Sequence, residues 1–371
     1  MENKNIDKTI KNLTKELKKL KDNKFKVFFF VYDTKGVPSG SLTYIYQTAY
    51  KLKELGYNVQ MLHSEKEFVG VGEWLGEKYA KLPHFNVSKD MIDSSPSDFL
   101  FIPEIYAEIM AKTKTLPCKR VAILQNYDFM TELIPAGATW GNMGIHDCVA
   151  TSQHLADRLT EVFPDVVTKV VRPCVDELFH DDGKEKKLIV NIITKDQNDY
   201  NSIVKPFIWK YPMYSFVPFR YVNGQSKEVF ADVLREGAIT VWNDPFTDFG
   251  ISALEAMACG NIVIGKIPES EPEWLVKDGD IQDNGVWFYN TKDIHGLLAS
   301  VIHTFLKDAT PNDILEAMKD TVDNYRAEKQ NEDIEEVYVK GLFRAREEEF
   351  ENMLKVLEKY KSENKEENKK D

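Results

Sequence analysis

One local pattern recurs along most of this sequence: a short apolar run, a polar turn, and a stretch with helical periodicity. The first series begins at Lys24 with KVFFFVY, continues through a polar turn, and reaches a helical run over Leu42–Leu55 that Gly56 closes. Alternating strands and helices predict a parallel sheet with helices on both faces, so we expect a doubly wound α/β first domain. Later strand-like runs of this series begin at Asn58 (NVQML), Asp98 (DFLFIP), Arg120 (RVAIL) and Asp147 (DCVATS).

A second series of the same kind follows the polar stretch 181–184. Its helical runs cover Lys227–Glu236 and Ile251–Cys259. A chain of 371 residues exceeds what one hydrophobic core usually organises, which also favours two domains. We therefore predict one domain over residues 1–180 and a second over 181–334. The strand-like runs of the second series begin at Lys187 (KLIVNII), Tyr214 (YSFVPF), Ala238 (AITVW), Asn261 (NIVIG) and Gly285 (GVWFY).

Both ends of the chain read as helices. Residues 5–24 place Ile6, Ile10, Leu13, Leu17 and Leu20 at helical spacing with lysines on the other face. Residues 335–360 form a second, charged helical pattern. The apolar face of the first helix carries no Trp or Phe, which favours packing on its own domain or on a partner helix over a membrane surface. A homo-oligomer formed through these helices is therefore an open alternative.

Composition indicates the cellular compartment and the kinds of partner that we expect. The longest apolar run, residues 27–32, is far short of the roughly 20 residues of a membrane span, and no signal-like leader precedes it, so we expect a cytoplasmic protein. Four cysteines without metal-type spacing predict free thiols, with no disulfide and no zinc. A net charge of −12 gives no general attraction to nucleic acid and leaves only a local basic patch as a route to it.

Residues 238–265 (AITVWNDPFTDFGISALEAMACGNIVIG) carry the main functional signal. Their pattern is strand, loop, short helix and strand. Ligands of open α/β sheets bind where loops leave the carboxyl ends of strands, and a helix starting there offers free amides to phosphate. A helix that begins near Ile251 therefore predicts a diphosphate site. Glu255 lies one turn into this helix, so its carboxylate can reach back to ligand hydroxyls.

This segment resembles the signature of the retaining GT-B glycosyltransferases, which include glycogen synthases and many mannosyl- and rhamnosyltransferases. Phe249 and Gly250 match its Phe-Gly, and Glu255 matches its second glutamate, which in the family binds the donor ribose. The resemblance implies phosphate contacts from the amides of Gly250, Ile251 and Ser252. Thr247 stands where the family has its first glutamate, near the donor sugar, and Asp248 replaces the following glycine.

Other segments resemble the same family between about residues 24 and 305. PEWLVKDG (272–279) and VVRPCVDELF (170–179) match a loop and the interdomain strand. Gly40 matches the glycine-rich loop after the first strand. ILQNYDFM (123–130) resembles a cleft loop of the rhamnosyltransferase-like branch and brings in Gln125, Asn126 and Asp128. Lys195 stands at the family's phosphate-binding arginine and Tyr200 at its lysine, so Arg220 or Lys266 is a candidate second cation.

The resemblance implies two Rossmann-like domains facing each other across a cleft, with a helix from 335–371 crossing back to the first. It also implies sugar transfer from a nucleoside diphosphate sugar such as a UDP-sugar, with retention, no cofactor and no required metal. The candidate catalytic residues are Thr247, Asp248, Asn126 and Lys195. The candidate donor-binding residues are Gly40, Lys195, Arg220, Phe249, Gly250, Ile251, Ser252 and Glu255.

The acceptor stays open between a saccharide, a lipid-linked molecule and a hydroxylated DNA base, as in some bacteriophage enzymes. The DNA alternative depends on the basic cluster Lys112, Lys114, Lys119 and Arg120 in the first domain. A third hypothesis is a catalytically silent nucleotide-sugar-binding or scaffold protein, suggested by Thr247 in place of the signature glutamate.

Overall fold

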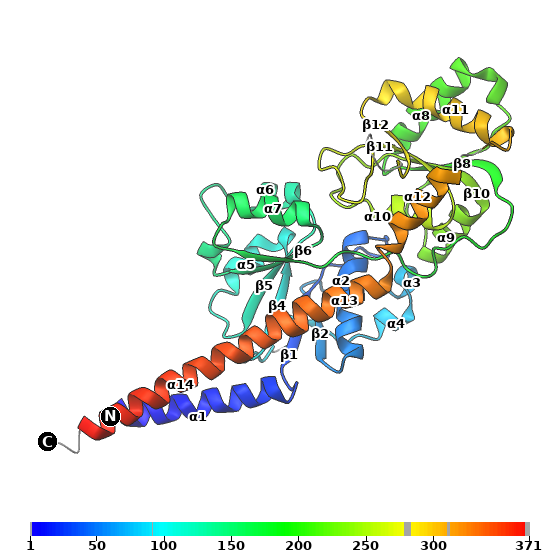
Figure 1. Ribbon diagram of the computed structural model, residues 1–371. Coiled ribbons are helices and arrows are strands. Elements are labelled where there is room, and N and C mark those ends of the chain that lie inside the picture. The colour runs from blue at the N-terminus through cyan, green and yellow to red at the C-terminus, as the bar shows by residue number, and fades with distance from the viewer. Residues whose placement is uncertain (1, 91, 278–282, 310–311, 368–371) are drawn as a thin grey trace.

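The computed structural model describes residues 2–90, 92–277, 283–309 and 312–367. Within these residues the chain forms two parallel sheets, each flanked by helices, in two lobes joined by extended segments (Figure 1). The first sheet has the strand order β3-β2-β1-β4-β5-β6-β7, so the chain reverses direction of winding between β1 and β4. Its strands are β1 (Lys26–Phe30), β2 (Asn58–His63), β3 (His84–Asn86), β4 (Phe99–Pro103), β5 (Lys119–Leu124), β6 (Asp147–Ala150) and β7 (Val167–Val170).

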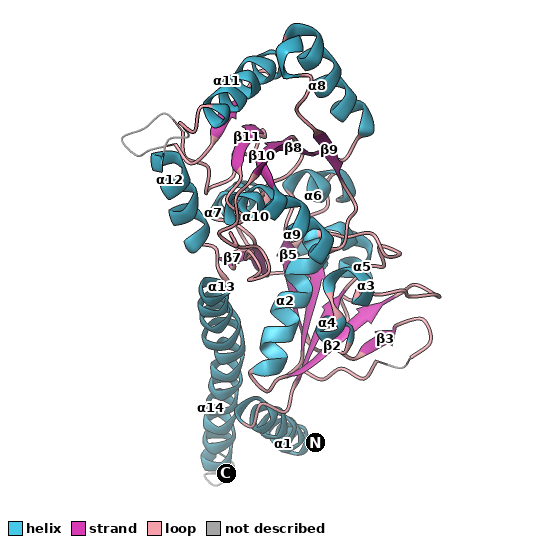
Figure 2. Ribbon diagram, turned by 90° about the vertical axis from the view of Figure 1, so that its right-hand side faces the viewer, coloured by secondary structure: helices cyan, strands magenta, loops and turns pink. Residues whose placement is uncertain are grey.

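Helices cover both faces of this first sheet, with α2 on one face and α5, α6 and α7 on the other (Figures 1 and 2). The helix α2 begins where Ser39 accepts a hydrogen bond from the amide of Leu42, a typical N-cap. The other helices of the first domain are α1 (Glu2–Lys21), α3 (Gly72–Leu75), α4 (Glu77–Ala80), η1 (Glu104–Tyr106), α5 (Ala107–Lys112), α6 (Tyr127–Leu133), η2 (Gly141–Met143) and α7 (Gln153–Val162), besides α2 (Gly40–Glu54).

The second sheet has the order β12-β11-β10-β8-β9, with its own reversal between β8 and β10. The strands are β8 (Lys187–Ile193), β9 (Phe219–Val222), β10 (Gly237–Trp242), β11 (Ile262–Lys266) and β12 (Val286–Phe288). Its helices are α8 (Gln197–Lys210), η3 (Pro212–Tyr214), α9 (Lys227–Glu236), α10 (Ile251–Ala258), η4 (Thr291–Asp293), α11 (Ile294–Leu306) and α12 (Asn312–Asp323).

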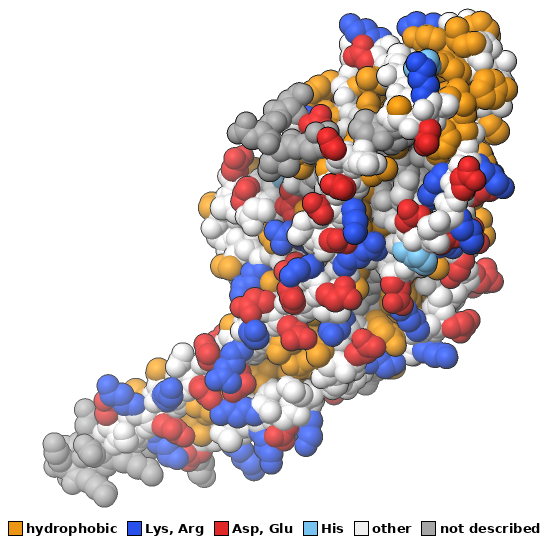
Figure 3. All heavy atoms as spheres, turned by 45° about the vertical axis from the view of Figure 1, so that its right-hand side comes forward, with side chains coloured by type: hydrophobic (Ala, Val, Ile, Leu, Met, Phe, Trp, Pro, Cys, Tyr) orange, Lys and Arg blue, Asp and Glu red, His pale blue; other side chains and the backbone are white. Residues whose placement is uncertain are grey.

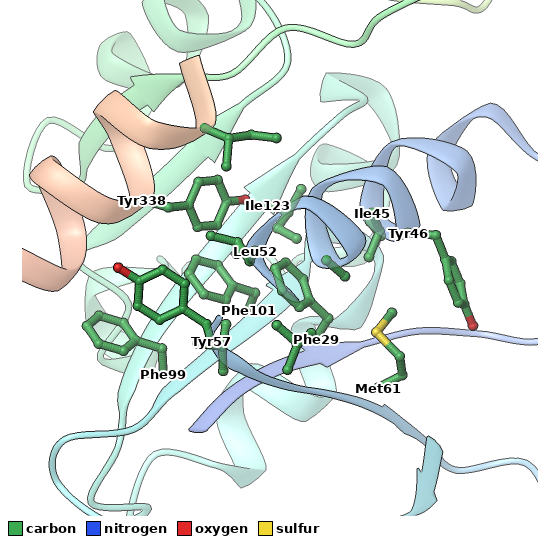
Figure 4. Packing of buried hydrophobic residues seen from close by; sticks show 14 of the residues in the cluster. Phe29, Ile45, Tyr46, Leu52, Tyr57, Met61, Phe99, Phe101, Ile123 and Tyr338 are labelled. Carbon is green, nitrogen blue, oxygen red and sulfur yellow. The ribbon is translucent and has the colours of Figure 1, made fainter. Parts of the chain in front are cut away.

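The chain then returns to the first domain through α13 (Ala327–Ile334), a π-helical segment η5 (Glu335–Phe343) and α14 (Arg344–Glu367). Tyr338 of this return segment is fully buried, with its ring centroid 4.9 Å from that of Phe101, which stacks on Phe29 (Figure 4). Burying large side chains such as these stabilises the fold by about 1.5–3 kcal/mol each. The return segment is thus part of the first domain's core, and beyond it α14 lies along α1 (Figure 1).

The expected fold class is confirmed, and two details differ. The strand expected at Tyr214 is wrong: Pro212–Tyr214 forms a 3₁₀ turn, and β9 starts only at Phe219, because Pro218 has no amide to donate to a ladder. The sequence reading also missed the short edge strands β3 and β7. The domain boundaries at 180 and 334 stay predictions, and Gly279 and 368–371 lie outside the described residues.

The four cysteines are free thiols buried in the interior, as expected. None of the helices in the described part of the chain has both the length and the hydropathy that crossing a bilayer requires.

Candidate functional site

A cavity of about 500 Å³ lies between the two domains. Its walls come from the loops that follow β1 and β5 in the first sheet and β8, β9 and β10 in the second. In each sheet the cavity therefore lies beside the point where the strand order reverses, which is where open α/β sheets bind ligands. Its size falls within the range of small-molecule sites.

Two helix N-termini meet at this cavity. The first residue of α2, Gly40, and the first residues of α10, Ile251 and Ser252, all line it. A Cβ on Gly40 would lie 3.7 Å from the Ile251 Cγ2, so the two helix ends are neighbours across the domain boundary. Both ends direct the positive pole of a helix dipole and unpaired amides toward one space, which favours an anion there.

Gly250 shapes the start of α10. It adopts φ +71°, and a Cβ at this position would come within 2.6 Å of Trp242. No side chain larger than hydrogen fits, so the backbone alone occupies the N-cap and leaves the following amides uncovered. The indole of Trp274 donates to the carbonyl of Phe249 at 2.5 Å and fixes the turn from behind.

Two lysines line the cavity, and each pairs with an aspartate. Lys195, after β8, is three-quarters exposed, and its Nζ lies 3.1 Å from Asp244 Oδ1. Lys227, at the start of α9, is nine-tenths buried, with its Nζ 2.9 Å from Asp176 Oδ2. Lys227 was not predicted from the sequence. It is the first residue of a helix that follows a strand of the second sheet and is capped by Ser226, and this position could have indicated a cavity residue.

The two residues predicted as a second cation, Arg220 and Lys266, lie away from the cavity lining. Arg220 pairs with Glu236 at 2.6 Å, and neither Arg220 nor Lys266 is among the described residues that line the cavity. Tyr200, at the family's lysine position, packs its ring on Tyr221 and donates its hydroxyl to a backbone carbonyl. Arg220 therefore lies outside the described cavity lining, and the second lysine in that lining is Lys227 of α9.

Glu255 lies at the cavity wall one turn into α10, beside the amides just described. Burial raises its pKa to about 8, with nearby Asp176 adding to the rise and Lys227 opposing it. A carboxylate whose ionised form is poorly solvated gains from hydroxyl donors, so this group is suited to bind vicinal hydroxyls of a ligand.

Thr247 and Asp248 are occupied by structural contacts. The Thr247 hydroxyl accepts from the amide of Gly250 at 3.0 Å, and its carbonyl accepts from Ser270 at 2.8 Å. Asp248 accepts from the amide of Tyr127 at 3.0 Å, which is the first residue of α6 in the other domain. Burial raises the pKa of Asp248. Both residues line the cavity while holding the loop and the domain contact.

A second interdomain contact follows the same design. Glu273, from the loop after β11, accepts from the amide of Gln153 at 2.8 Å, which is the first residue of α7. The other oxygen of Glu273 pairs with Arg172 of the interdomain segment at 2.7 Å. Each of these two contacts sets a carboxylate of the second domain on the positive N-terminus of a first-domain helix, which is favourable for the charge.

Asn126 completes the domain contact. Its side-chain amide donates to the carbonyl of Phe246 at 3.1 Å, while its oxygen caps α6 by accepting from Phe129. Gln125 and Asn126 line the cavity, whereas Asp128 is not among its described lining residues. Beneath this loop the buried Glu104, which the sequence reading missed, accepts from the amide of Asn126, and burial raises its pKa to about 8.

The basic cluster behind the DNA alternative is used internally. Lys119 pairs with Asp147, Lys112 pairs with Glu108, and Lys114 donates to the carbonyl of Asn142. Arg120 is buried and donates to three backbone carbonyls. Each of the four cations in this cluster therefore already has a partner within its own domain. Within the described residues no group of three or more His, Cys, Asp or Glu side chains could hold a metal ion.

Comparison with known proteins shows which solved structures share this fold. No protein-family model and no curated protein sequence matches the chain. Among solved structures, the pneumococcal O-GlcNAc transferase GtfA with UDP and GlcNAc is similar at a TM-score of 0.59 and 7% identity, over 90% of this chain and 99% of that one. The S. aureus protein TarM, solved with fondaparinux, alpha-GlcNAc-glycerol and UDP, gives a TM-score of 0.64 at 8% identity, over 83% and 98%.

The Anabaena protein HepE, solved with UDP-glucose, is similar at a TM-score of 0.57 and 13% identity, covering 85% of this chain and 99% of that one. These neighbours are GT-B glycosyltransferases, and the chain has their fold: two parallel-sheet α/β domains with a helical C-terminus.

Proposed function

We propose that this protein is a glycosyltransferase that transfers a sugar from a nucleoside diphosphate sugar to an acceptor entering the interdomain cavity. The observation that carries the proposal is the convergence of the α10 N-terminus, Lys195, Lys227 and Glu255 on one cavity. Free amides and cations suit a diphosphate, and a carboxylate one helical turn away suits ribose hydroxyls. The GT-B fold, whose neighbours above were solved with UDP or UDP-glucose, supports the same conclusion.

In the proposed reaction the leaving group is the nucleoside diphosphate. The amides of Ile251 and Ser252 would stabilise the negative charge that builds on its phosphate oxygens as the glycosidic bond breaks, as an oxyanion hole does. The amide of Gly250, which the resemblance also assigned to phosphate, donates instead to the Thr247 hydroxyl. Lys195 and Lys227 would add positive charge without needing to move a proton. The resemblance to the retaining family supports transfer with retention. In this proposal the amides and lysines stabilise the charge of the leaving diphosphate, so no metal is needed.

The remaining predicted residues have other roles in this proposal. Phe249 packs on Tyr325 and holds the loop, and Gly40 brings α2 close to the diphosphate. Thr247, Asp248 and Asn126, which the sequence suggested as catalytic, act in this proposal as positioning residues that keep the two domains together around the donor. A hexose donor with UDP as its nucleotide is the form to test first.

A panel of UDP-, GDP-, ADP- and dTDP-sugars tests the proposal through donor hydrolysis, since transferases leak some transfer to water. We expect slow turnover with one donor class and its loss in Glu255→Ala. The exposed Glu316 on α12 provides the control, and Glu316→Ala should retain the wild-type rate. An absence of both turnover and nucleotide binding across the panel would overturn the proposal and favour the scaffold alternative.

A further inference from the structure

The far end of the second domain carries a group of exposed apolar side chains. Trp209 at the end of α8 is 75% exposed, Met213 and Phe216 around η3 are each 62% exposed, and Leu306 at the end of α11 is 50% exposed. We call these four residues the tip patch. Figure 3 shows hydrophobic side chains gathered over this end of the molecule. Apolar groups clustered on a surface in this way mark an interaction site.

The tip patch is held in place from beneath. Phe207 is fully buried, and its ring packs against those of Tyr211 and Tyr214 at centroid distances of 5.5 and 6.2 Å. The Tyr214 hydroxyl lies 3.5 Å from Nδ1 of His303, and this contact connects η3 to α11. The exposed side chains therefore sit on an ordered support and are presented outward.

Charge is segregated around the tip patch. No Asp or Glu occurs from Tyr200 to Lys227, a run of 28 residues, although the chain's 60 acids in 371 residues predict between four and five. The helix α11 also carries no acid, although Asp293 precedes its first residue and Asp308 follows its last residue by two positions. Lys205, Lys210 and Lys307 are exposed here. In a protein of net charge −12, this end has the opposite sign.

The geometry points to an anionic lipid surface as the partner of the tip patch, and we infer that the protein docks on membranes through this end. Trp, Tyr and Phe with lysines are the side chains that occupy a membrane interface. Protein interfaces are depleted in lysine, which argues against a protein partner for a patch whose cations are all lysines. Negative headgroups complement these lysines, each contributing about 1 kcal/mol near such a surface.

The position suits docking that leaves the cavity open. The helix α8 begins beside Lys195 at the cavity and ends at the tip patch, about 21 Å further along at 1.5 Å per residue. A membrane contacting the tip patch would therefore lie beyond the second domain and away from the interdomain cavity. This inference stands on the surface alone and does not depend on the proposed sugar transfer.

Vesicle sedimentation with the full chain tests the inference. Vesicles of phosphatidylcholine and phosphatidylglycerol in equal parts should pellet the wild-type protein, and pure phosphatidylcholine vesicles should pellet much less. Trp209→Ser with Phe216→Ser should lower the partition coefficient at least about tenfold. Lys205→Ala with Lys210→Ala should lower it about 25-fold, or about fivefold per lysine, and added salt should reproduce that loss.

The matched control removes exposed apolar groups elsewhere. Val356→Ser with Tyr360→Ser changes α14, where these side chains are 68% and 46% exposed, and should partition as the wild type does. The inference is overturned if the wild type does not pellet, if both tip variants partition unchanged, or if only the α14 variant loses binding. A concentration-dependent dimer that the Trp209 variant abolishes, without vesicle binding, would assign the tip patch to a second copy instead.

Discussion

The loop and helix between β10 and β11 divide into two parts that treat their polar groups in opposite ways. In the part from Phe246 to Asp248, the contacts run to the protein itself: to the amide of Gly250, to Ser270 and to the first domain. In the part from Gly250 to Glu255, a bare N-cap, first-turn amides and a carboxyl face the cavity. Residues 246–248 therefore hold the loop and the two domains together, and we call them the fastening part. Residues 250–255 face the cavity, and we call them the ligand-facing part.

This division coincides with where the sequence resembles the family signature and where it does not. The proposed phosphate contacts depend on backbone geometry, which Gly250 and the helix that follows provide. The positions of Thr247 and Asp248 depend on side chains, and here these side chains close the turn and join the domains.

The largest effect should come from Gly250→Ala. Its φ of +71° and the 2.6 Å approach to Trp242 combine backbone strain with overpacking, and we expect a loss of about 3 kcal/mol in the free energy of unfolding. Gly183→Ala has nearly the same φ, +70°, with open space around it, so it should lose only about 1 kcal/mol. Urea unfolding followed by tryptophan fluorescence compares them, and equal losses would remove the packing argument.

Glu255→Gln should break the ligand-facing part without unfolding it. With the pKa of Glu255 near 8, hydroxyl donors bind the ionised form, so wild-type nucleotide affinity should gain a component that rises with pH up to about 8. The Gln variant lacks this component and should bind about tenfold more weakly at pH 8.5. Calorimetric titrations at pH 6.5 and 8.5 measure both, and parallel pH profiles for the two proteins contradict the assignment.

Lys195→Ala sharpens the comparison by testing which cation faces the ligand. Removing a charge-assisted contact to phosphate should weaken diphosphate binding about tenfold. Arg220→Ala, which removes another paired cation of the second domain, should leave binding unchanged, because Arg220 pairs with Glu236 outside the cavity lining. Binding of a nucleoside diphosphate relative to its nucleoside gives the readout, and an effect of Arg220 alone would reverse the conclusion.

Thr247→Val should have the smallest effect. It keeps the shape of the side chain and removes the hydroxyl that accepts from Gly250, which costs about 1 kcal/mol of stability. Nucleotide binding should change less than threefold, since the hydroxyl serves the turn. Thr304→Val on α11, whose hydroxyl makes an exposed contact to a backbone carbonyl, controls for the loss of a threonine hydroxyl. A tenfold loss of binding in Thr247→Val alone would place its hydroxyl on the ligand.

The fold was largely predictable because its signals are local. Apolar strands such as 187–193 and 237–242, each followed by a turn and a helix, determine a parallel sheet without knowledge of distant contacts. The strand expected at Tyr214 failed because Pro218 interrupts an otherwise apolar run and Pro212 begins a 3₁₀ turn just before it. The edge strands β3 and β7 were missed because three or four residues carry too little pattern.

The residues that line the cavity were predictable where a local pattern places them, and not where their partners are remote in the sequence. Gly40, Gly250 and Glu255, to which the family resemblance pointed, line the cavity because loops after parallel strands carry them there. Lys227 enters from another helix, and its pairing with Asp176 depends on how that helix packs. The fastening roles of Asp248 and Glu273 involve residues 121 and 120 positions away, which no local pattern reports.

The central claim is that the cavity at the N-terminus of α10 binds a nucleoside diphosphate. Isothermal titration of the full-length protein with UDP, GDP, ADP and dTDP, each beside its nucleoside, tests it most directly. The account predicts that one diphosphate binds with one-to-one stoichiometry, far more tightly than its nucleoside, and that Glu255→Gln and Lys195→Ala each weaken it. Failure of all four diphosphates to bind, or binding that both variants leave unchanged, would contradict it.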